Sequence, residues 1–182
     1  MTLFLPELID RDNDKMNIRQ SLFSIINVEE PLISALSNAA ALLYHSLENI
    51  NWCGFYLFDG EKLVLGPFGG KTACTTIAMG KGVCGTAAQE QRIIRVADVN
   101  EFPGHIACDP GSRSEIVLPI ILSDNTLFGV LDIDAPMTDR FTSSDETELQ
   151  EVVKVLVAKI EAIQKLKRPA KAPPIPLIHE IP

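Results

Sequence analysis

The chain has 182 residues, a formal net charge of −8, and 46% hydrophobic and 22% charged residues. This length and composition fit one globular domain with a sizeable core, and the acidic balance makes nucleic acid a poor partner. No apolar run approaches the roughly 18 residues of a membrane helix. The start lacks the basic segment of a signal peptide, so we expect a cytoplasmic protein without membrane contact.

The first half of the chain predicts helices followed by a hairpin. Two acids and a proline at 29–31 are typical of a helix start, because proline fits the first turn and acids stabilise its positive end. Apolar residues then recur at helical spacing. Asp59-Gly60 is a typical hairpin turn. The expected elements are helices over 16–26 and 29–49, and strands over 52–58, 62–68 and 74–79.

The second half predicts further hairpins and a long final helix. A loop at 99–113 is rich in glycine and proline, and Ser123-Asp124-Asn125 is a turn. The expected elements are a short helix over 83–91, strands over 92–98, 114–122 and 126–134, and a helix over 143–166. Hairpin connections dominate, which indicates an α+β fold with a central antiparallel β-sheet and helices packed on one face.

Three parts are expected along the chain. Residues 1–15 are a polar N-terminal lead-in, residues 16–166 form the domain, and residues 167–182 are a C-terminal tail rich in proline. Such a tail does not form a helix and is expected to be extended.

Four cysteines are candidates for chemistry. Cys53 lies in mid-strand between aromatic residues, where a small buried thiol is its natural interpretation. Cys74 begins a predicted strand, and Cys108 lies in the long loop. Cys84 lies near a helix N-terminus, where the dipole favours a thiolate. In a reducing compartment these residues are thiols, metal ligands or redox catalysts rather than structural bridges.

Spacing alone leaves the role of the last three cysteines open. They are compatible with three unrelated thiols. A zinc site with His105 as fourth ligand is a weaker alternative, because spacers of nine and twenty-three residues differ from the tight pairs of structural zinc sites. A nucleophilic dyad of His105 and Cys108 is also weak, since no third orienting group is identifiable.

Three carboxylates interrupt apolar strands. Asp132 and Asp134 are two residues apart and therefore share one face of a strand. Glu115 begins the preceding strand, and a turn near residue 124 brings all three acids to one end of a hairpin. In a cleft the pKa of at least one acid rises, so that it can donate a proton, and the cluster can also hold an ammonium group. Solvated acids at a strand end are the alternative.

Two aromatic residues lie on the first strand. Trp52 and Tyr56 are four residues apart and share a face. Core packing is one interpretation. The other is a wall of a small pocket next to the carboxylates, in contact with a methyl or ammonium group.

Six segments carry a resemblance to a known family: NWCGFYLF, LVLGPFGGKTAC, GKGVCGTA, GHIACD, SEIVLP and GVLDID, in this order and at these intervals. Over about residues 16–166 the chain resembles the free methionine-(R)-sulfoxide reductases, enzymes with a GAF-domain fold. The resemblance implies reduction of free L-methionine-(R)-sulfoxide by thiol chemistry, with thioredoxin as reductant. It also implies a homodimer and no metal or bound cofactor.

The resemblance also implies a role for each candidate residue. Cys108 matches the catalytic cysteine, Cys74 the principal resolving cysteine, and Cys84 a second thiol able to form a disulfide with the catalytic one. Glu115, Asp132 and Asp134 match the substrate-binding and acid residues. The resemblance leaves open which of the three donates the proton, and Asp134 is our choice for polarising the sulfoxide. The remaining substrate-binding residues are Glu115 and Asp132, which are expected to hold the ammonium group, and Trp52 and Tyr56, which are expected to hold the methyl end.

A GAF sensor module is the alternative from another class of protein. Such a module binds a small ligand or senses redox state without turnover, and the fold permits it because fold does not fix function. A sensor usually adjoins an output domain, and the sequence shows none. Three placed cysteines together with three acids favour catalysis.

Overall fold

The computed structural model describes residues 18–104 and 109–167. The helices are α1 (Ile18–Ile25), α2 (Leu32–Ser46), α3 (Gly82–Glu90) and α4 (Ser143–Lys167), with a short 3-10 helix η1 (Val99–Glu101). The strands are β1 (Trp52–Phe58), β2 (Lys62–Gly70), β3 (Thr76–Ala78), β4 (Ile94–Val96), β5 (Ser114–Ile121) and β6 (Leu127–Ala135). His105, Cys108 and the predicted lead-in and tail, apart from Lys167, lie outside the described residues, and the domain bounds stay a prediction.

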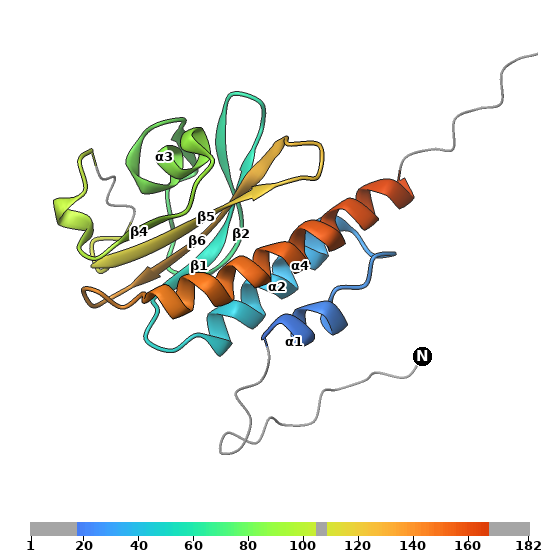
Figure 1. Ribbon diagram of the computed structural model, residues 1–182, viewed down its shortest axis with the longest axis horizontal. Coiled ribbons are helices and arrows are strands. Elements are labelled where there is room, and N and C mark those ends of the chain that lie inside the picture. Colours follow the sequence, from blue (N-terminus) through green and yellow to red (C-terminus); the bar gives the residue numbers. More distant parts are fainter. Residues whose placement is uncertain (1–17, 105–108, 168–182) are drawn as a thin grey trace, which may run out of the picture.

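The six strands form one antiparallel sheet in the order β3-β2-β1-β6-β5-β4 (Figure 1). The predicted α+β class is therefore confirmed. The strand β1 lies in the middle, between its hairpin partner β2 and the distant β6. Because β5 and β6 also form a hairpin, three central strands bring the start of β1 and β5 next to the end of β6.

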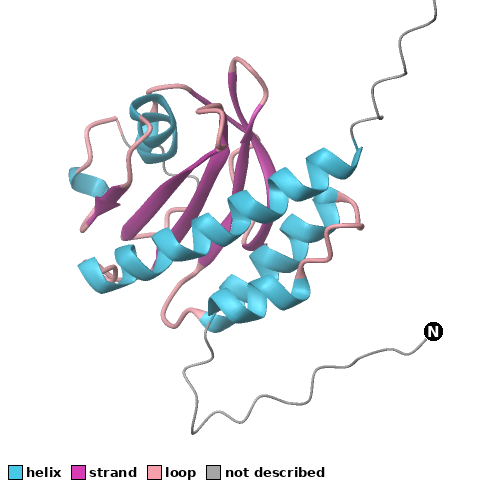
Figure 2. Ribbon diagram, turned by 45° about the vertical axis from the view of Figure 1, so that its right-hand side comes forward, coloured by secondary structure: helices cyan, strands magenta, loops and turns pink. Residues whose placement is uncertain are grey.

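The helices cover both faces of the sheet. Figure 2 shows α1, α2 and α4 on one side and α3 on the other. The expectation of helices on one face therefore missed α3. This helix is short and buries Val83, Ala87 and Ala88 in a second core with Val117 and Val130 of the sheet. Its small apolar side chains allow the helix to lie close to the strands, directly above the carboxylates.

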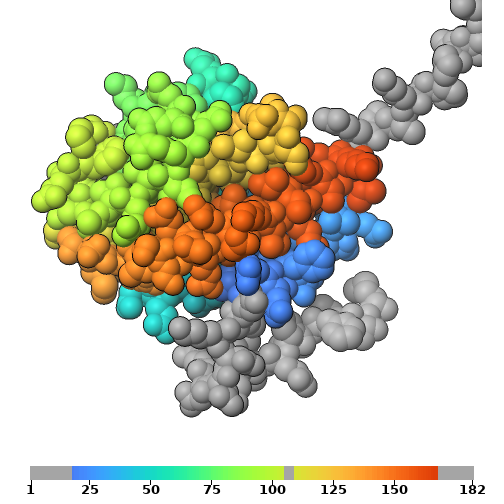
Figure 3. Space-filling view, viewed as in Figure 1, coloured from blue at the N-terminus to red at the C-terminus, as the bar shows by residue number. Residues whose placement is uncertain are grey.

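The sheet separates two apolar cores. The larger lies between the sheet and α1, α2 and α4, and includes Phe55, Leu131 and the fully buried Cys53. Figure 3 shows α4 running across the outside of this layer beside α1. The smaller core lies on the α3 side. Cys53 is buried as expected, behind the sheet from the other described cysteines of the candidate site.

The long helix α4 begins with a reciprocal cap between Thr142 and Asp145. The backbone N–H of Thr142 donates to Asp145 Oδ2 at 2.7 Å, and the backbone N–H of Asp145 donates to Thr142 Oγ1 at 3.2 Å. Among residues 18–104 and 109–167, none of the helices has the length and apolar character needed to cross a membrane.

Candidate active site

The strand register brings the three carboxylates together. Glu115 lies directly opposite Asp134, which lies opposite Trp52 on the other side. Asp132 lies one row further along, between Val117 and Gly54. Opposite residues of antiparallel strands point to the same face, so all three acids face α3. The prediction that the three acids meet at one end of the β5–β6 hairpin is confirmed.

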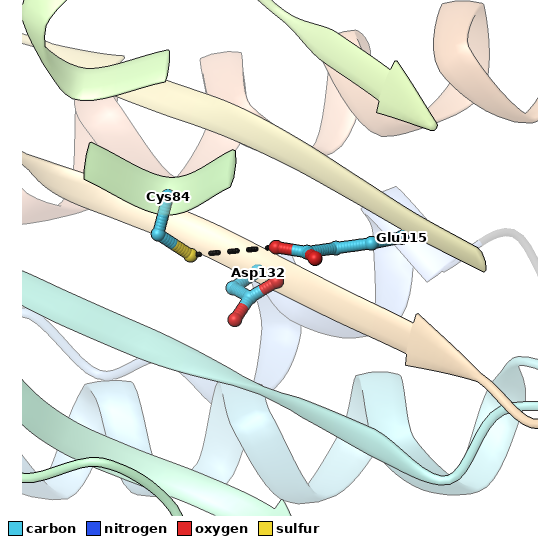
Figure 4. A group of neighbouring side chains, drawn as sticks. All are labelled: Cys84, Glu115 and Asp132. Carbon is cyan, nitrogen blue, oxygen red and sulfur yellow. Dashed lines mark hydrogen bonds between the residues drawn. The ribbon is translucent and has the colours of Figure 1, made fainter. Parts of the chain in front are cut away.

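Cys84 reaches this cluster from α3. Its Sγ donates a hydrogen bond to Glu115 Oε1 at 3.8 Å. Figure 4 shows Cys84 pointing from the helix toward Glu115 on β5, with the Asp132 carboxylate of β6 close to both. One ligand atom of each of the three residues lies within 4.8 Å of the other two. A thiol and two carboxylates therefore share one buried space, in a donor set that could hold a metal ion.

Burial and mutual repulsion set the protonation of the acids. Burial, followed by the charges of Asp132 and Asp134, raises the pKa of Glu115 well above its usual range. Burial and the charge of Asp132 do the same for the pKa of Asp134. Burial raises the pKa of Asp132 only to about 6, because hydrogen bonds with Cys84 and Glu115 oppose it. Burial and mutual repulsion therefore favour the neutral forms of Glu115 and Asp134, whereas hydrogen bonds favour the charged form of Asp132.

The expectation of a Cys84 thiolate is wrong. Although Cys84 is the third residue of α3, burial raises the pKa of its thiol well above the usual range, and the charges of Asp132 and Glu115 raise it further. The partial positive charge of a helix N-terminus is smaller than the combined effect of burial and two acids. Cys84 is a protonated thiol that donates to a carboxylate.

A pocket opens beside the cluster. The space at this site, including the open solvent at its mouth, is about 390 Å³, and it is lined by all three carboxylates, Cys84 and Tyr56. Its other lining residues include Asp109 and Ser112 from the long loop and Lys81 at the start of α3. Sequence reasoning missed these three residues, because polar side chains in loops carry no periodic signal. The position of the loop, which follows residue 104 and leads into β5, was the available clue.

The two aromatic residues take different positions. Tyr56 lines the pocket, and its hydroxyl donates to the backbone oxygen of Cys74 at 3.1 Å. Trp52 stacks on Tyr56 with 5.8 Å between ring centroids and on Phe68 with 5.4 Å, and it is not among the lining residues. A Cβ on Gly54 would lie 2.4 Å from Phe68 Cβ, so glycine is needed for this stack. Trp52 supports the wall that Tyr56 presents.

The described cysteines differ in state. Cys74 is half-buried and takes part in a disulfide, whereas Cys53 and Cys84 are free thiols. The Tyr56 hydroxyl fixes the backbone of Cys74 next to the pocket wall. Cys108 lies outside the described residues, and its neighbour Asp109 lines the pocket.

A network at the start of β1 holds the loop that follows residue 108. The Nδ2 of Asn51 donates to Asp109 Oδ2 and to Ser112 Oγ, both at 3.1 Å. Lys71 Nζ lies 3.4 Å from the same Asp109 oxygen. The backbone N–H of Gly111 donates to Asp109, which, with Asn51 and Lys71, lowers the pKa of Asp109. The loop is therefore anchored to the sheet beside the pocket.

Replacing Asn51 with alanine should loosen this loop. The change removes two side-chain hydrogen bonds, so we expect a loss of about 1–3 kcal/mol in the free energy of unfolding. Hydrogen exchange should accelerate at Gly111 and Ser112. Hydrogen–deuterium exchange mass spectrometry measures it, with the exposed Asn38→Ala on α2 as control. Unchanged exchange over 109–112 would show that Asn51 does not anchor the loop.

Comparison with known proteins gives concordant matches. Residues 31–160 match the family model described as GAF domain. The free methionine-R-sulfoxide reductase of Escherichia coli K12 is 50% identical over 135 residues, which cover 74% of this chain and 79% of that protein.

Solved structures agree. The Neisseria meningitidis free methionine-R-sulfoxide reductase in complex with its substrate superposes with a TM-score of 0.79 at 36% identity, over 91% of this chain and 99% of that chain. The Staphylococcus aureus fRMsr in complex with substrate gives a TM-score of 0.75 at 48% identity, over 84% of this chain and 99% of that chain.

Proposed function

The chain belongs to the free methionine-R-sulfoxide reductase family of GAF-domain proteins, and we propose that it reduces free L-methionine-(R)-sulfoxide to methionine. The observation that carries the proposal is that three carboxylates and a thiol line the same pocket and are largely buried. Related proteins have been solved with substrate, and they share the fold over most of this chain.

The charges of the pocket suit a zwitterionic amino acid. Asp132, whose charged form is favoured by hydrogen bonds with Cys84 and Glu115, supplies negative charge for the substrate ammonium. Lys81 and the N-terminus of α3 line the same pocket and supply positive potential for the substrate carboxylate. Tyr56 offers an aromatic face for the methyl end, supported from behind by Trp52.

The proton donor is proposed to be Asp134. Burial raises the pKa of both Asp134 and Glu115, so either carboxyl is a candidate proton donor. Glu115 is the more enclosed of the two and accepts a hydrogen bond from Cys84, whereas Asp134 is half-buried. Asp134 is therefore better placed to polarise the S=O bond, and Glu115 and Asp132 to hold the ammonium group.

The steps of the thiol chemistry are assigned to three cysteines. The Cys108 thiolate attacks the sulfoxide sulfur, the sulfoxide oxygen passes to Cys108 as a sulfenic acid with uptake of a proton, and methionine leaves. The thiol of Cys74 condenses with the sulfenic acid, releasing water and forming a disulfide. Thioredoxin then reduces this disulfide by exchange, becoming oxidised itself. Cys84 is a second thiol that can pair with Cys108.

A cytoplasmic location and a homodimer complete the proposal. A thioredoxin system maintains reduced thiols in the cytosol. On the face opposite the pocket, apolar side chains of the first two helices are exposed, with Phe23 at 64% and Ile33 at 57%. This surface suits a second copy of the chain, and light scattering of the full chain tests it; a monomeric mass at micromolar concentration contradicts it.

A coupled assay tests the proposed function. The protein is incubated with NADPH, thioredoxin reductase, thioredoxin and free L-methionine-(R)-sulfoxide. NADPH consumption that depends on the protein and the R epimer is expected. The S epimer is the control for stereochemistry. A sulfoxide within a peptide is the second control, because the pocket must bind both the free ammonium and the free carboxylate. If a reduced, folded sample consumes no NADPH, the reductase proposal is wrong and the GAF sensor module is the remaining alternative.

A further inference from the structure

We propose that Cys84, Glu115 and Asp132 form a binding site for a thiophilic divalent cation of the zinc class. The three ligand atoms come from α3, β5 and β6, and each lies within 4.8 Å of the others (Figure 4). Ligand atoms around a tetrahedral zinc ion lie about 3.5 Å apart. Contraction by at most about 1.3 Å through side-chain torsions therefore suffices, and all three side chains line the same pocket.

An unsatisfied oxygen points to a ligand at this place. Asp132 is 6% exposed, and its Oδ1 is buried without a hydrogen-bond partner among the described residues. Asp132 also lines the pocket. A buried carboxylate oxygen without a partner is unfavourable. A cation bound between Asp132 and Cys84 would supply the missing partner.

The donor set selects the type of cation. One sulfur and two carboxylate oxygens suit zinc or cadmium, whereas calcium and magnesium require six or more oxygens. Binding converts the Cys84 thiol to a thiolate, and its proton goes to solvent. Glu115 binds the cation as a carboxylate, and the proton of its neutral form likewise goes to solvent. Asp134, which lies opposite Glu115, and a water molecule are available for the fourth position.

The cation and the substrate would compete for the same carboxylates. This consequence alone depends on the proposed function, in which Glu115 and Asp132 hold the substrate ammonium. Cation binding itself does not depend on it, so it is tested without substrate.

The test uses cadmium and the full chain carrying Cys74→Ser and Cys108→Ser. These changes leave Cys84 and Cys53 as the only thiols of the sequence. Cadmium–thiolate bonds absorb in the ultraviolet, and we expect a charge-transfer band that saturates at one ion per chain. Adding Cys84→Ser should abolish this band. Adding Cys53→Ser is the matched control and should leave it, because Cys53 lies in the core on the other face of the sheet.

A second variant keeps both thiols. Glu115→Gln in the same background should weaken cadmium binding by about tenfold or more, as measured by calorimetry. The exposed Glu101→Gln is its control. Absence of the band in the background protein, a band that survives Cys84→Ser, or full affinity in Glu115→Gln would each overturn the proposal. Circular dichroism shows whether each variant is folded. If Cys84→Ser does not fold, the affinity of Glu115→Gln decides the test.

Discussion

A chain with serine in place of Cys108 should show no turnover of free methionine-(R)-sulfoxide, a loss of at least about a thousandfold in kcat. Serine keeps the size of the side chain and removes the thiolate, which is the only form that attacks the sulfoxide sulfur. The carboxylates of the pocket remain, so substrate binding should survive. The coupled NADPH assay measures the rate, and calorimetry measures binding.

Cys74→Ser separates the first chemical step from recycling. This variant should release about one methionine per chain and then recycle poorly, because the sulfenic acid lacks its principal partner. Cys53→Ser is the control and should keep the normal rate, since Cys53 is fully buried behind the sheet. Activity in Cys108→Ser would remove Cys108 as nucleophile. Normal multiple turnover in Cys74→Ser would move the resolving role to Cys84.

Asp132→Asn should stabilise the fold and weaken substrate binding. The pKa of Asp132 is raised from 3.8 to about 6, so the folded state holds its proton more tightly than the unfolded state. The favourable contribution of that proton is complete below about pH 4 and is lost as the pH rises through about 6. Above pH 7, asparagine avoids this loss, and we expect a gain of about 2–3 kcal/mol in the free energy of unfolding.

Two measurements check this prediction. Thermal unfolding at pH 7.5 should show Tm higher by about 5 °C in Asp132→Asn, and the difference should disappear near pH 4. KM for the sulfoxide should rise about tenfold or more, because the ammonium loses its charged partner. Asp98→Asn is the control. Hydrogen bonds from Asn100 N and Arg113 lower the pKa of Asp98, so its loss should slightly decrease Tm. A lower Tm in Asp132→Asn would contradict the prediction.

The sequence predicted the fold and the position of the acids because both depend on local periodicity. Alternation placed Asp132 and Asp134 on one face, and the turn at 123–125 fixed their distance from Glu115. The face of the sheet on which α3 packs could not be predicted in this way. It depends on which surface of the sheet has room for a short helix with small side chains.

The state of Cys84 and the role of Asn51 depend on tertiary contacts. The helix N-terminus suggested a thiolate, but the neighbours that decide the pKa come from β5 and β6, 31 residues or more along the chain. In the sequence Asn51 is simply the residue before a predicted strand, but its side chain donates hydrogen bonds to Asp109 and Ser112, some sixty residues later. Nothing periodic connects such pairs. The assignment of Cys108 and Cys74 rests on the family resemblance.

The sheet separates the core under α2 and α4 from the pocket under α3, and its side chains point alternately to the two sides. Residues of β1, β5 and β6 alternate between the core under α2 and α4 and the pocket under α3. These three strands therefore connect the packing of the long helices to the pocket. The surface that the outer helices present to other molecules and the chemistry of the pocket thus lie on opposite sides of one sheet.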